Sequence, residues 1–197
     1  MKPMNIYLCG VGGQGIGLLS EIMIQSCLKA GHAVKGVDTH GLAQRGGIVF
    51  SNIRLGEGVH TPMIAPGEAD LILGLERLEA YRGIVSMLRD GGSVVYYDCE
   101  YQPIHVRMGK AAYPSVEDVQ QAVAKRHGHV QRVHIDDLAD PRMQNVALLG
   151  RVATMGIIEG LTPQVVEQSL RDVLPGALMD ANLEILHRAA MKTQAGS

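Results

Sequence analysis

The sequence predicts one α/β domain over residues 1–197: a Rossmann-like, mostly parallel sheet with helices on both faces, a β-hairpin insertion and C-terminal helices. Short apolar runs typical of buried strands alternate along the chain with segments whose apolar residues recur at helical spacing. A glycine-rich turn, GVGGQG at 10–15, joins the first apolar run to the first helical segment. The length of 197 residues and the hydrophobic content of 46% suit a single domain with a substantial core.

The first elements form a strand–helix–strand unit. An apolar strand over 4–9 enters the glycine turn, and apolar residues at helical spacing run from Ile16 to a stop at Gly31. A second strand over 32–37 ends at Asp38. Because this order normally closes a right-handed crossover, we expect the two strands to form a parallel pair.

A departure from the simple alternation follows. The segment THGLAQRGG at 39–47 is rich in glycine and polar groups and predicts a loop. Residues 48–55 alternate between apolar and polar side chains, which predicts a strand, and Gly56-Glu57-Gly58 predicts a hairpin turn after it. We therefore expect an antiparallel insertion in this region.

The α/β alternation then resumes, and the chain ends in helices. Thr162 and Pro163 have the N-cap and first-position preferences of a helix start. The expected elements are a strand over 69–73, a helix over 76–88, a turn at 90–92 into a strand over 93–97, a short strand over 104–106, a helix over 116–127, a strand over 130–135, and helices over 144–155, 163–173 and 177–192.

The composition restricts the classes of partner. A formal net charge of −2, no Trp and one Phe provide neither the basic stripe nor the stacking aromatic residues of a nucleic-acid site. Three cysteines far apart in sequence form no CxxC pair, and His127, His129 and His134 lack a carboxylate at metal-ligand spacing, so we expect no metal site. The chain starts without a signal-peptide pattern, and no apolar run approaches the roughly 20 residues that span a bilayer. We expect a cytoplasmic protein with no membrane contact.

The glycine turn is the first candidate binding site. Gly10, Gly12 and Gly15 match G-x-G-x-x-G between a strand and a helix, where free N–H groups at the helix start attract a phosphate or another anion. Asp38 lies 23 residues after Gly15, near where a dinucleotide fold places its ribose-binding acid. Two structural alternatives stay open: the glycines only make the tight crossover turn, and Asp38 only caps a turn. Residues 39–47 also lack the second helix that a dinucleotide-binding half needs.

Three phrases together carry a family resemblance. They are GVGGQG at Gly10–Gly15, HGLAQRGG at His40–Gly47 and NVALLG at Asn145–Gly150. With them, the chain from about Asn5 onward resembles the gamma subunit, or gamma domain, of 2-oxoacid:ferredoxin oxidoreductases. Within that family, HGLAQRGG is similar to the phrase of the free-standing beta subunit of the indolepyruvate enzymes, which favours an arylpyruvate substrate.

The resemblance implies an accessory role for this chain. In that family, thiamine diphosphate and iron–sulfur clusters on a catalytic partner subunit convert a 2-oxoacid and coenzyme A to acyl-CoA and carbon dioxide, and the electrons pass to ferredoxin or a similar acceptor. This chain has no thiamine motif and no cluster cysteines. We therefore expect no catalytic residue here, an inactive isolated chain, and a heteromeric complex that could itself pair into a homodimer.

The resemblance also implies which residues contact a cofactor, with coenzyme A or an adenine nucleotide as the candidate. Arg45 is expected to reach a phosphate or the catalytic subunit; its alternative is an intramolecular salt bridge. His40 donates to a ligand, relays a proton near neutral pH, or only acts as a hydrogen-bonded strut. Gln14 either binds a group or caps its turn. The full candidate set is Gly10, Gly12, Gly13, Gln14, Gly15, Asp38, His40, Gln44, Arg45, Gly46 and Gly47.

Two functions of other classes remain as alternatives. A stand-alone NAD(P)-binding oxidoreductase would use Gly10, Gly12, Gly15 and Asp38. A non-catalytic nucleotide-binding module would bind its ligand without partner subunits.

Overall fold

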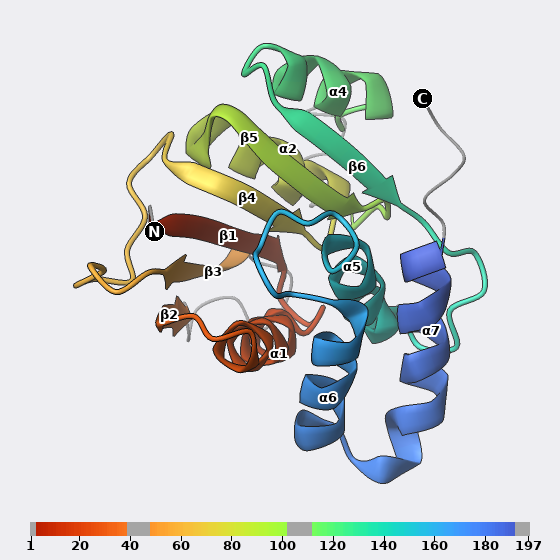
Figure 1. Cartoon of the computed structure of the whole chain (residues 1–197). Coiled ribbons are helices and arrows are strands. Elements are labelled where there is room, and N and C mark those ends of the chain that lie inside the picture. Colours follow the sequence, from red (N-terminus) through yellow and green to blue (C-terminus); the bar gives the residue numbers. More distant parts are fainter. Residues whose placement is uncertain (1–2, 39–47, 102–111, 192–197) are drawn as a thin grey trace.

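The computed structural model describes residues 3–38, 48–101 and 112–191. In this part of the chain six strands form one sheet in the order β2-β3-β1-β4-β5-β6 (Figure 1). The strands are β1 Met4–Val11, β2 Val34–Asp38, β3 Ile48–Leu55, β4 Ala69–Gly74, β5 Leu88–Tyr97 and β6 His129–Val133. The helices are α1 Ile16–Lys29, α2 Arg77–Met87, α4 Val116–Ala124, α5 Gln144–Val152, α6 Pro163–Val173 and α7 Met179–Met191, with short 3-10 turns at Pro141–Met143 and Gly176–Leu178.

Four neighbouring strands are parallel, and the insertion lies beside them. β1, β4, β5 and β6 pair in parallel, whereas β3 is antiparallel to both β1 and β2. The expected parallel pair of β1 and β2 is wrong, because β3 lies between these strands: Leu55 is opposite Met4 on one side and opposite Val34 on the other. β3 can fill this position because its residues 51–53 are buried, as in an interior strand.

The predicted hairpin exists, but it is formed by other strands than expected. β2 and β3 are consecutive and antiparallel, so the hairpin closes across residues 39–47, which lie outside the described residues. Gly56–Gly58 does form a turn, in which Val59 N donates to Gly56 O at 3.3 Å. No strand follows that turn before β4. The turn therefore ends β3, and it does not lead into the second strand of a hairpin.

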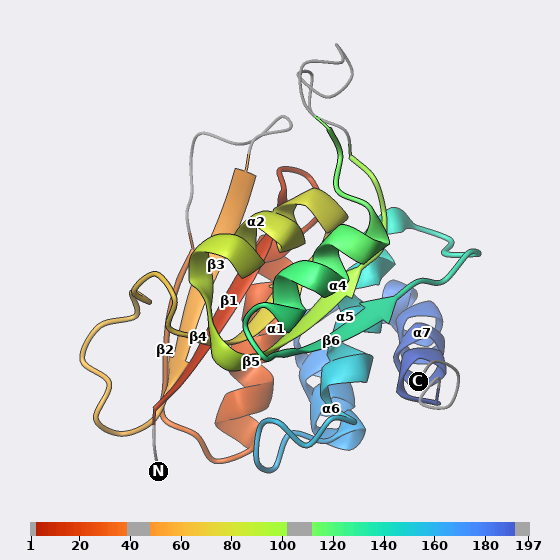
Figure 2. The same cartoon turned by 90° about the horizontal axis from the view of Figure 1, so that it is seen from above.

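Helices cover both faces of the sheet, as predicted. Figure 2 shows α2 and α4 on one face, with α1, α5, α6 and α7 on the other. The larger core cluster joins the second group to the sheet, and the smaller one lies under α2 and α4. In the part of the chain that the structure describes, none of these helices has the length and apolar character needed to cross a bilayer.

Several predicted boundaries shift by a few residues. α4 ends at Ala124 and not at 127, because His127 has a positive φ of 49° and the chain turns there. β5 already begins at Leu88, so residues 90–92 belong to the strand and not to a turn before it. The 144–155 helix stops at Val152, the last helix starts at Met179 after a 3-10 turn, and the strand expected at 104–106 lies outside the described residues. The start of α6 is confirmed: Thr162 Oγ1 accepts from Val165 N at 3.3 Å.

The helices that follow β1 and β4 pack on opposite faces of the sheet, and this change of face marks the candidate ligand-binding edge. The chain leaves β1 into α1 on one face and leaves β4 into α2 on the other. In open α/β sheets, such a switch point at the carboxyl ends of parallel strands is where ligands bind.

Candidate functional site

The carboxyl ends of the parallel strands bring four segments of the chain together. We call this set the switch-point edge: residues 10–15 after β1, 75–76 after β4, 98–101 after β5, and 144–145 at the start of α5. Backbone bonds fix it, since Leu75 N donates to Cys9 O at 2.8 Å. Residues 39–47 are not described, but Ile48, which follows them, pairs with Val11 at the same edge.

The glycine loop is shaped from inside by Gln14, whose side chain is only 3% exposed. Its Oε1 accepts from Val11 N at 2.7 Å, and its Nε2 donates to Leu75 O at 3.0 Å. Gly10 leaves the room that this amide needs, because a Cβ at Gly10 would lie 2.9 Å from Gln14 Oε1. Of the two roles predicted for Gln14, its contacts favour the structural one.

Among the described residues, no side chain caps the start of α1. Its N-cap, Gly15, has a φ of 83° and supplies no side-chain cap, and the first turn contains no acidic residue. Side chains at Gly13 and Gly17 would meet nothing within 4 Å, so the space around the loop is open at both positions. Free N–H groups and a helix dipole at an open helix start suit an anion.

Asn145, the first residue of the motif NVALLG, contacts the glycine loop GVGGQG. Its Nδ2 donates to Gly15 O at 3.0 Å, across 130 residues of sequence. A Cβ on Gly15 would lie 2.8 Å from that nitrogen, so the loop glycine is needed for the contact as well as for its positive φ. Asn145 is fully buried, and its Oδ1 has no hydrogen-bond partner among the described residues. The Asn145 side-chain oxygen is therefore an acceptor beside the glycine loop that no described residue satisfies.

Cys99 lies at the centre of a buried amide–thiol network that sequence reasoning missed. Its Sγ donates to Leu75 O at 3.2 Å and lies 3.5 Å from Gln144 Oε1, and Gln14 Nε2 lies 3.7 Å from the same sulfur. Burial raises the pKa of the Cys99 thiol to about 12, and the nearby Glu76 carboxylate adds to the shift. The sulfur is thus a protonated structural donor near neutral pH and not a nucleophile.

Glu76 is a fully buried carboxylate at the switch point. As N-cap of α2, it accepts from Glu79 N at 2.8 Å through Oε2, and it accepts from Tyr101 N at 3.3 Å through Oε1. Desolvation raises the pKa of Glu76 to about 7, and the bonds from the backbone amides oppose the rise. The sequence marks Glu76 only as a helix start, since nothing adjacent to it indicates the contact with Tyr101.

We expect the Glu76→Gln substitution to change the pH dependence of stability. Between the ordinary pKa of a glutamate, 4.5, and the folded value of about 7, the folded state retains a proton that the unfolded state has lost. Glu76 therefore makes stability fall as pH rises through this window, and glutamine removes that decline. Urea unfolding at several pH values between 4.5 and 8 should show the variant gaining on the parent as pH rises. A stability difference that is constant with pH would contradict this assignment.

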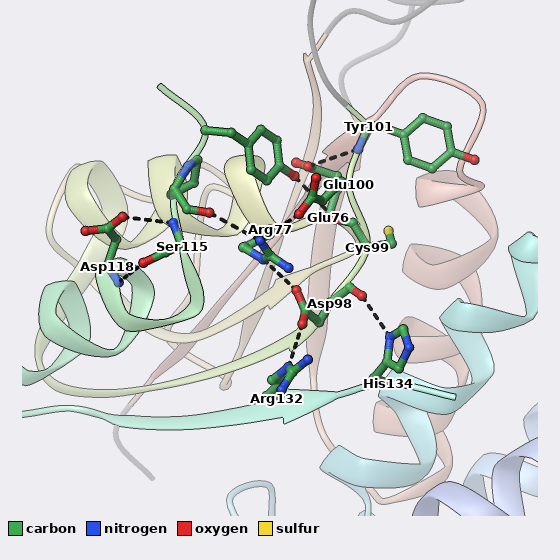
Figure 3. Close-up of polar contacts among 12 residues, drawn as sticks. Glu76, Arg77, Asp98, Cys99, Glu100, Tyr101, Ser115, Asp118, Arg132 and His134 are labelled. Atoms are coloured by element: carbon green, nitrogen blue, oxygen red, sulfur yellow. Dashed lines mark hydrogen bonds and ion pairs between the residues drawn. The ribbon is translucent and has the colours of Figure 1, made fainter. Parts of the chain in front are cut away.

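An ion network supports the ends of β5 and β6. Figure 3 shows Arg77 and Arg132 approaching Asp98 from different sides, with His134 near its backbone carbonyl. Arg77 Nε lies 2.6 Å from Asp98 Oδ1, Arg132 Nε lies 2.5 Å from Oδ2, and His134 Nδ1 lies 2.9 Å from the Asp98 carbonyl oxygen. Arg77 Nη1 also bonds Glu100 at 2.9 Å. These contacts join the start of α2 to the ends of β5 and β6, next to residues 99–101.

Of the predicted site residues outside the glycine loop, the structure describes only Asp38. Asp38 Oδ1 accepts from Ser20 Oγ of α1 at 2.8 Å, and its strand is separated from β1 by β3, which is not the adjacent-strand arrangement of a dinucleotide fold. His40, Gln44, Arg45, Gly46 and Gly47 lie outside the described residues. Within the described ranges, no cluster of three metal-ligating side chains occurs, and His127 Nδ1 lies 2.8 Å from Asp90.

Fold and site together define an open α/β protein with a glycine loop at its switch point. The chain belongs to the pyruvate ferredoxin/flavodoxin oxidoreductase family, whose profile matches residues 5–191. It is 36% identical over 184 residues to the indolepyruvate oxidoreductase subunit IorB of Methanothermobacter thermautotrophicus, covering 91% of this chain and 92% of that one. The IorB subunit of Pyrococcus horikoshii is 34% identical over 190 residues, with 93% of both chains covered.

Solved structures agree in fold. The gamma subunit of a keto/oxoacid ferredoxin oxidoreductase from Geobacter sulfurreducens has a TM-score of 0.64 at 18% identity, covering 98% of this chain and 99% of that one. The PORC subunit of pyruvate oxidoreductase from Thermotoga maritima has a TM-score of 0.65 at 21% identity, with 96% of both chains covered. The 2-oxoglutarate:ferredoxin oxidoreductase of Magnetococcus marinus has a TM-score of 0.66 at 17% identity, and only 30% of its matched chain is covered.

These findings confirm the family that the three phrases resemble and the predicted fold class. They also favour a subunit of an oxidoreductase complex over a stand-alone NAD(P)-dependent enzyme.

Proposed function

We propose that this chain is the accessory, gamma-type subunit of a thiamine diphosphate- and iron–sulfur-dependent 2-oxoacid:ferredoxin oxidoreductase that acts on indolepyruvate or another arylpyruvate. The observation that carries the proposal is the likeness to indolepyruvate oxidoreductase IorB subunits along nearly the whole length of both chains. The complex converts the 2-oxoacid and coenzyme A to acyl-CoA and carbon dioxide and passes two electrons to ferredoxin or a similar acceptor. We expect it to work in the cytoplasm.

The cysteines of this chain support the placement of the clusters on a partner subunit. Cys9 and Cys27 are buried and Cys99 is half-buried, and none of them is in a disulfide. Burial raises the pKa of Cys27 and Cys99 to about 12, and it also raises that of Cys9. Cluster ligation needs thiolates, usually four of them, so these residues do not fit an iron–sulfur cluster.

The glycine loop is the proposed contact for a phosphate of coenzyme A or of an adenine nucleotide. Gly10, Gly12, Gly13 and Gly15 form the turn from β1 into α1, whose start has no side-chain cap among the described residues, and Asn145 holds the Gly15 carbonyl in place. Gln14 and Asp38 contribute by shaping and supporting the loop and its neighbouring strand. His40, Gln44, Arg45, Gly46 and Gly47 belong to the same proposed site through the family resemblance.

Reconstitution with the thiamine diphosphate-binding subunit tests the proposed function. We expect the two chains to copurify and the complex to reduce an artificial electron acceptor with indolepyruvate and coenzyme A. Each chain alone should be inactive. Activity of this chain by itself, or enhanced fluorescence of NADH on binding to it, would overturn the proposal. Tight nucleotide binding with no association would favour the non-catalytic nucleotide-binding module.

We expect Arg45→Ala to weaken coenzyme A binding in the assembled complex. A guanidinium pairs strongly with phosphate, and its loss should raise the Michaelis constant for coenzyme A about tenfold or more. The Michaelis constant for the 2-oxoacid should change little. Steady-state kinetics with coenzyme A as the varied substrate measures this, and Arg142→Ala, at an exposed arginine paired with Asp140, serves as a matched control. An unchanged constant for coenzyme A would remove Arg45 from the site.

A further inference from the structure

A groove of about 310 Å³ lies between α2 and α4, on the face of the sheet that these two helices cover. Its apolar part consists of Tyr81 and Val85 from α2 and Ala122 from α4. Val85 is 53% exposed. The other lining residues are Asp118, Gln121, Lys125 and Arg126, so the groove combines apolar and polar side chains, as protein–protein contacts do.

The groove also carries net positive charge at one end. Lys125 has no ion-pair partner among the described residues, and Arg126 follows it at the end of α4. The Arg126 guanidinium is fixed, because its Nη2 donates to Val85 O at 3.1 Å and so caps the end of α2. At the other end, Asp118 accepts from Ser115 N at 2.8 Å, so its carboxylate serves the capping box of α4 (Figure 3). On a chain of net charge −2, this is a local cationic site.

The groove is separate from the proposed coenzyme site. α2 and α4 begin near the switch-point edge and run away from it. Val85 and Arg126, at the ends of these helices, therefore lie toward the amino ends of the parallel strands. Gly91, near the start of β5, donates to Arg126 O at 2.7 Å and confirms this placement. A substitution at the cationic end therefore leaves the glycine loop untouched.

We propose that this groove docks an acidic segment of the catalytic partner subunit. An apolar side chain of that segment enters between Tyr81 and Val85, and one or two carboxylates face Lys125 and Arg126. Buried apolar anchors ringed by polar contacts contribute most of the energy of many interfaces, and charge complementarity raises the rate of association. The inference rests on the proposed function, since it assumes that this chain assembles with that subunit.

The test measures binding of this chain to the purified thiamine diphosphate-binding subunit by biolayer interferometry at several salt concentrations. Lys125→Glu should weaken binding about tenfold or more and flatten its salt dependence, and Lys125→Arg should bind like the parent. Val85→Asp should weaken binding by a similar factor. Lys35→Glu on β2 and Leu28→Asp on α1 make the same changes at exposed positions elsewhere and should stay within about twofold.

The outcomes separate the two proposals. If the parent chain does not bind the partner subunit, the proposed function fails, and the docking inference fails with it. If the parent binds and both groove variants bind equally well, only the docking inference is overturned. Self-association of this chain that Lys125→Glu abolishes, without an effect on binding to the partner subunit, would assign the groove to a second copy and also overturn it. Circular dichroism checks that each variant is folded.

Discussion

Asp98→Asn should lower the free energy of unfolding by about 3 kcal/mol. The Asp98 side chain is 2% exposed and neutralises two guanidinium groups, at 2.6 Å from Arg77 and 2.5 Å from Arg132. Asparagine is nearly isosteric, but it has no charge and places an NH₂ group opposite one of the two arginines. Removing one partner of a buried ion pair is strongly destabilising, because it leaves a buried charge poorly compensated; here Arg77 would keep only the half-exposed Glu100. Arg77 is the more affected partner, since its side chain is only 15% exposed.

Glu100→Gln in the same network provides the matched control. Glu100 also bonds Arg77, at 2.9 Å, but its side chain is 46% exposed. Exposed ion pairs contribute less than about 1 kcal/mol, so the control should be nearly neutral. Urea unfolding at pH 7 compares the two variants. Equal losses would mean that burial does not determine the strength of this network.

Features set by neighbouring residues are the ones that the sequence predicts well. The glycine turn, the N-cap Thr162 and the alternation of 48–55 each depend on a few consecutive residues, and each is found where expected. The order of the strands in the sheet, in contrast, is not set by a few consecutive residues. The strand over 48–55 pairs on both sides, and no local pattern distinguishes an interior strand at this position from one arm of an outer hairpin. The expected pairing of β1 with β2 was wrong for this reason.

The candidate site likewise combines residues that sequence motifs identify with residues that only tertiary packing brings together. The glycines and Asn145 belong to phrases that can be read from the sequence, but the contact between Asn145 and Gly15 spans 130 residues. Cys99 and Glu76 carry no motif at all. They belong to the site because two strand ends and a helix start meet there, and their raised pKa values come from burial that only tertiary packing produces.

Gln14→Leu distinguishes a structural role of Gln14 from ligand binding. Leucine has a similar size, but it removes the acceptor of Val11 N and the stronger of the two donors to Leu75 O, which keeps only the weak thiol donor Cys99. Each such loss costs roughly 1 to 3 kcal/mol, so we expect the free energy of unfolding to fall by about 3 kcal/mol. Gln168→Leu, at an exposed position of α6, should have little effect.

The second readout of Gln14→Leu is coenzyme A affinity in the assembled complex, measured by calorimetry. The side-chain amide of Gln14 fixes the backbone between Val11 and Leu75, so its loss should disturb the donors at the start of α1 and weaken binding together with stability. A glutamine that bonded the ligand directly would behave differently: the variant would lose affinity and keep its stability. Lost affinity at unchanged stability would therefore reassign Gln14 from loop support to the binding contact.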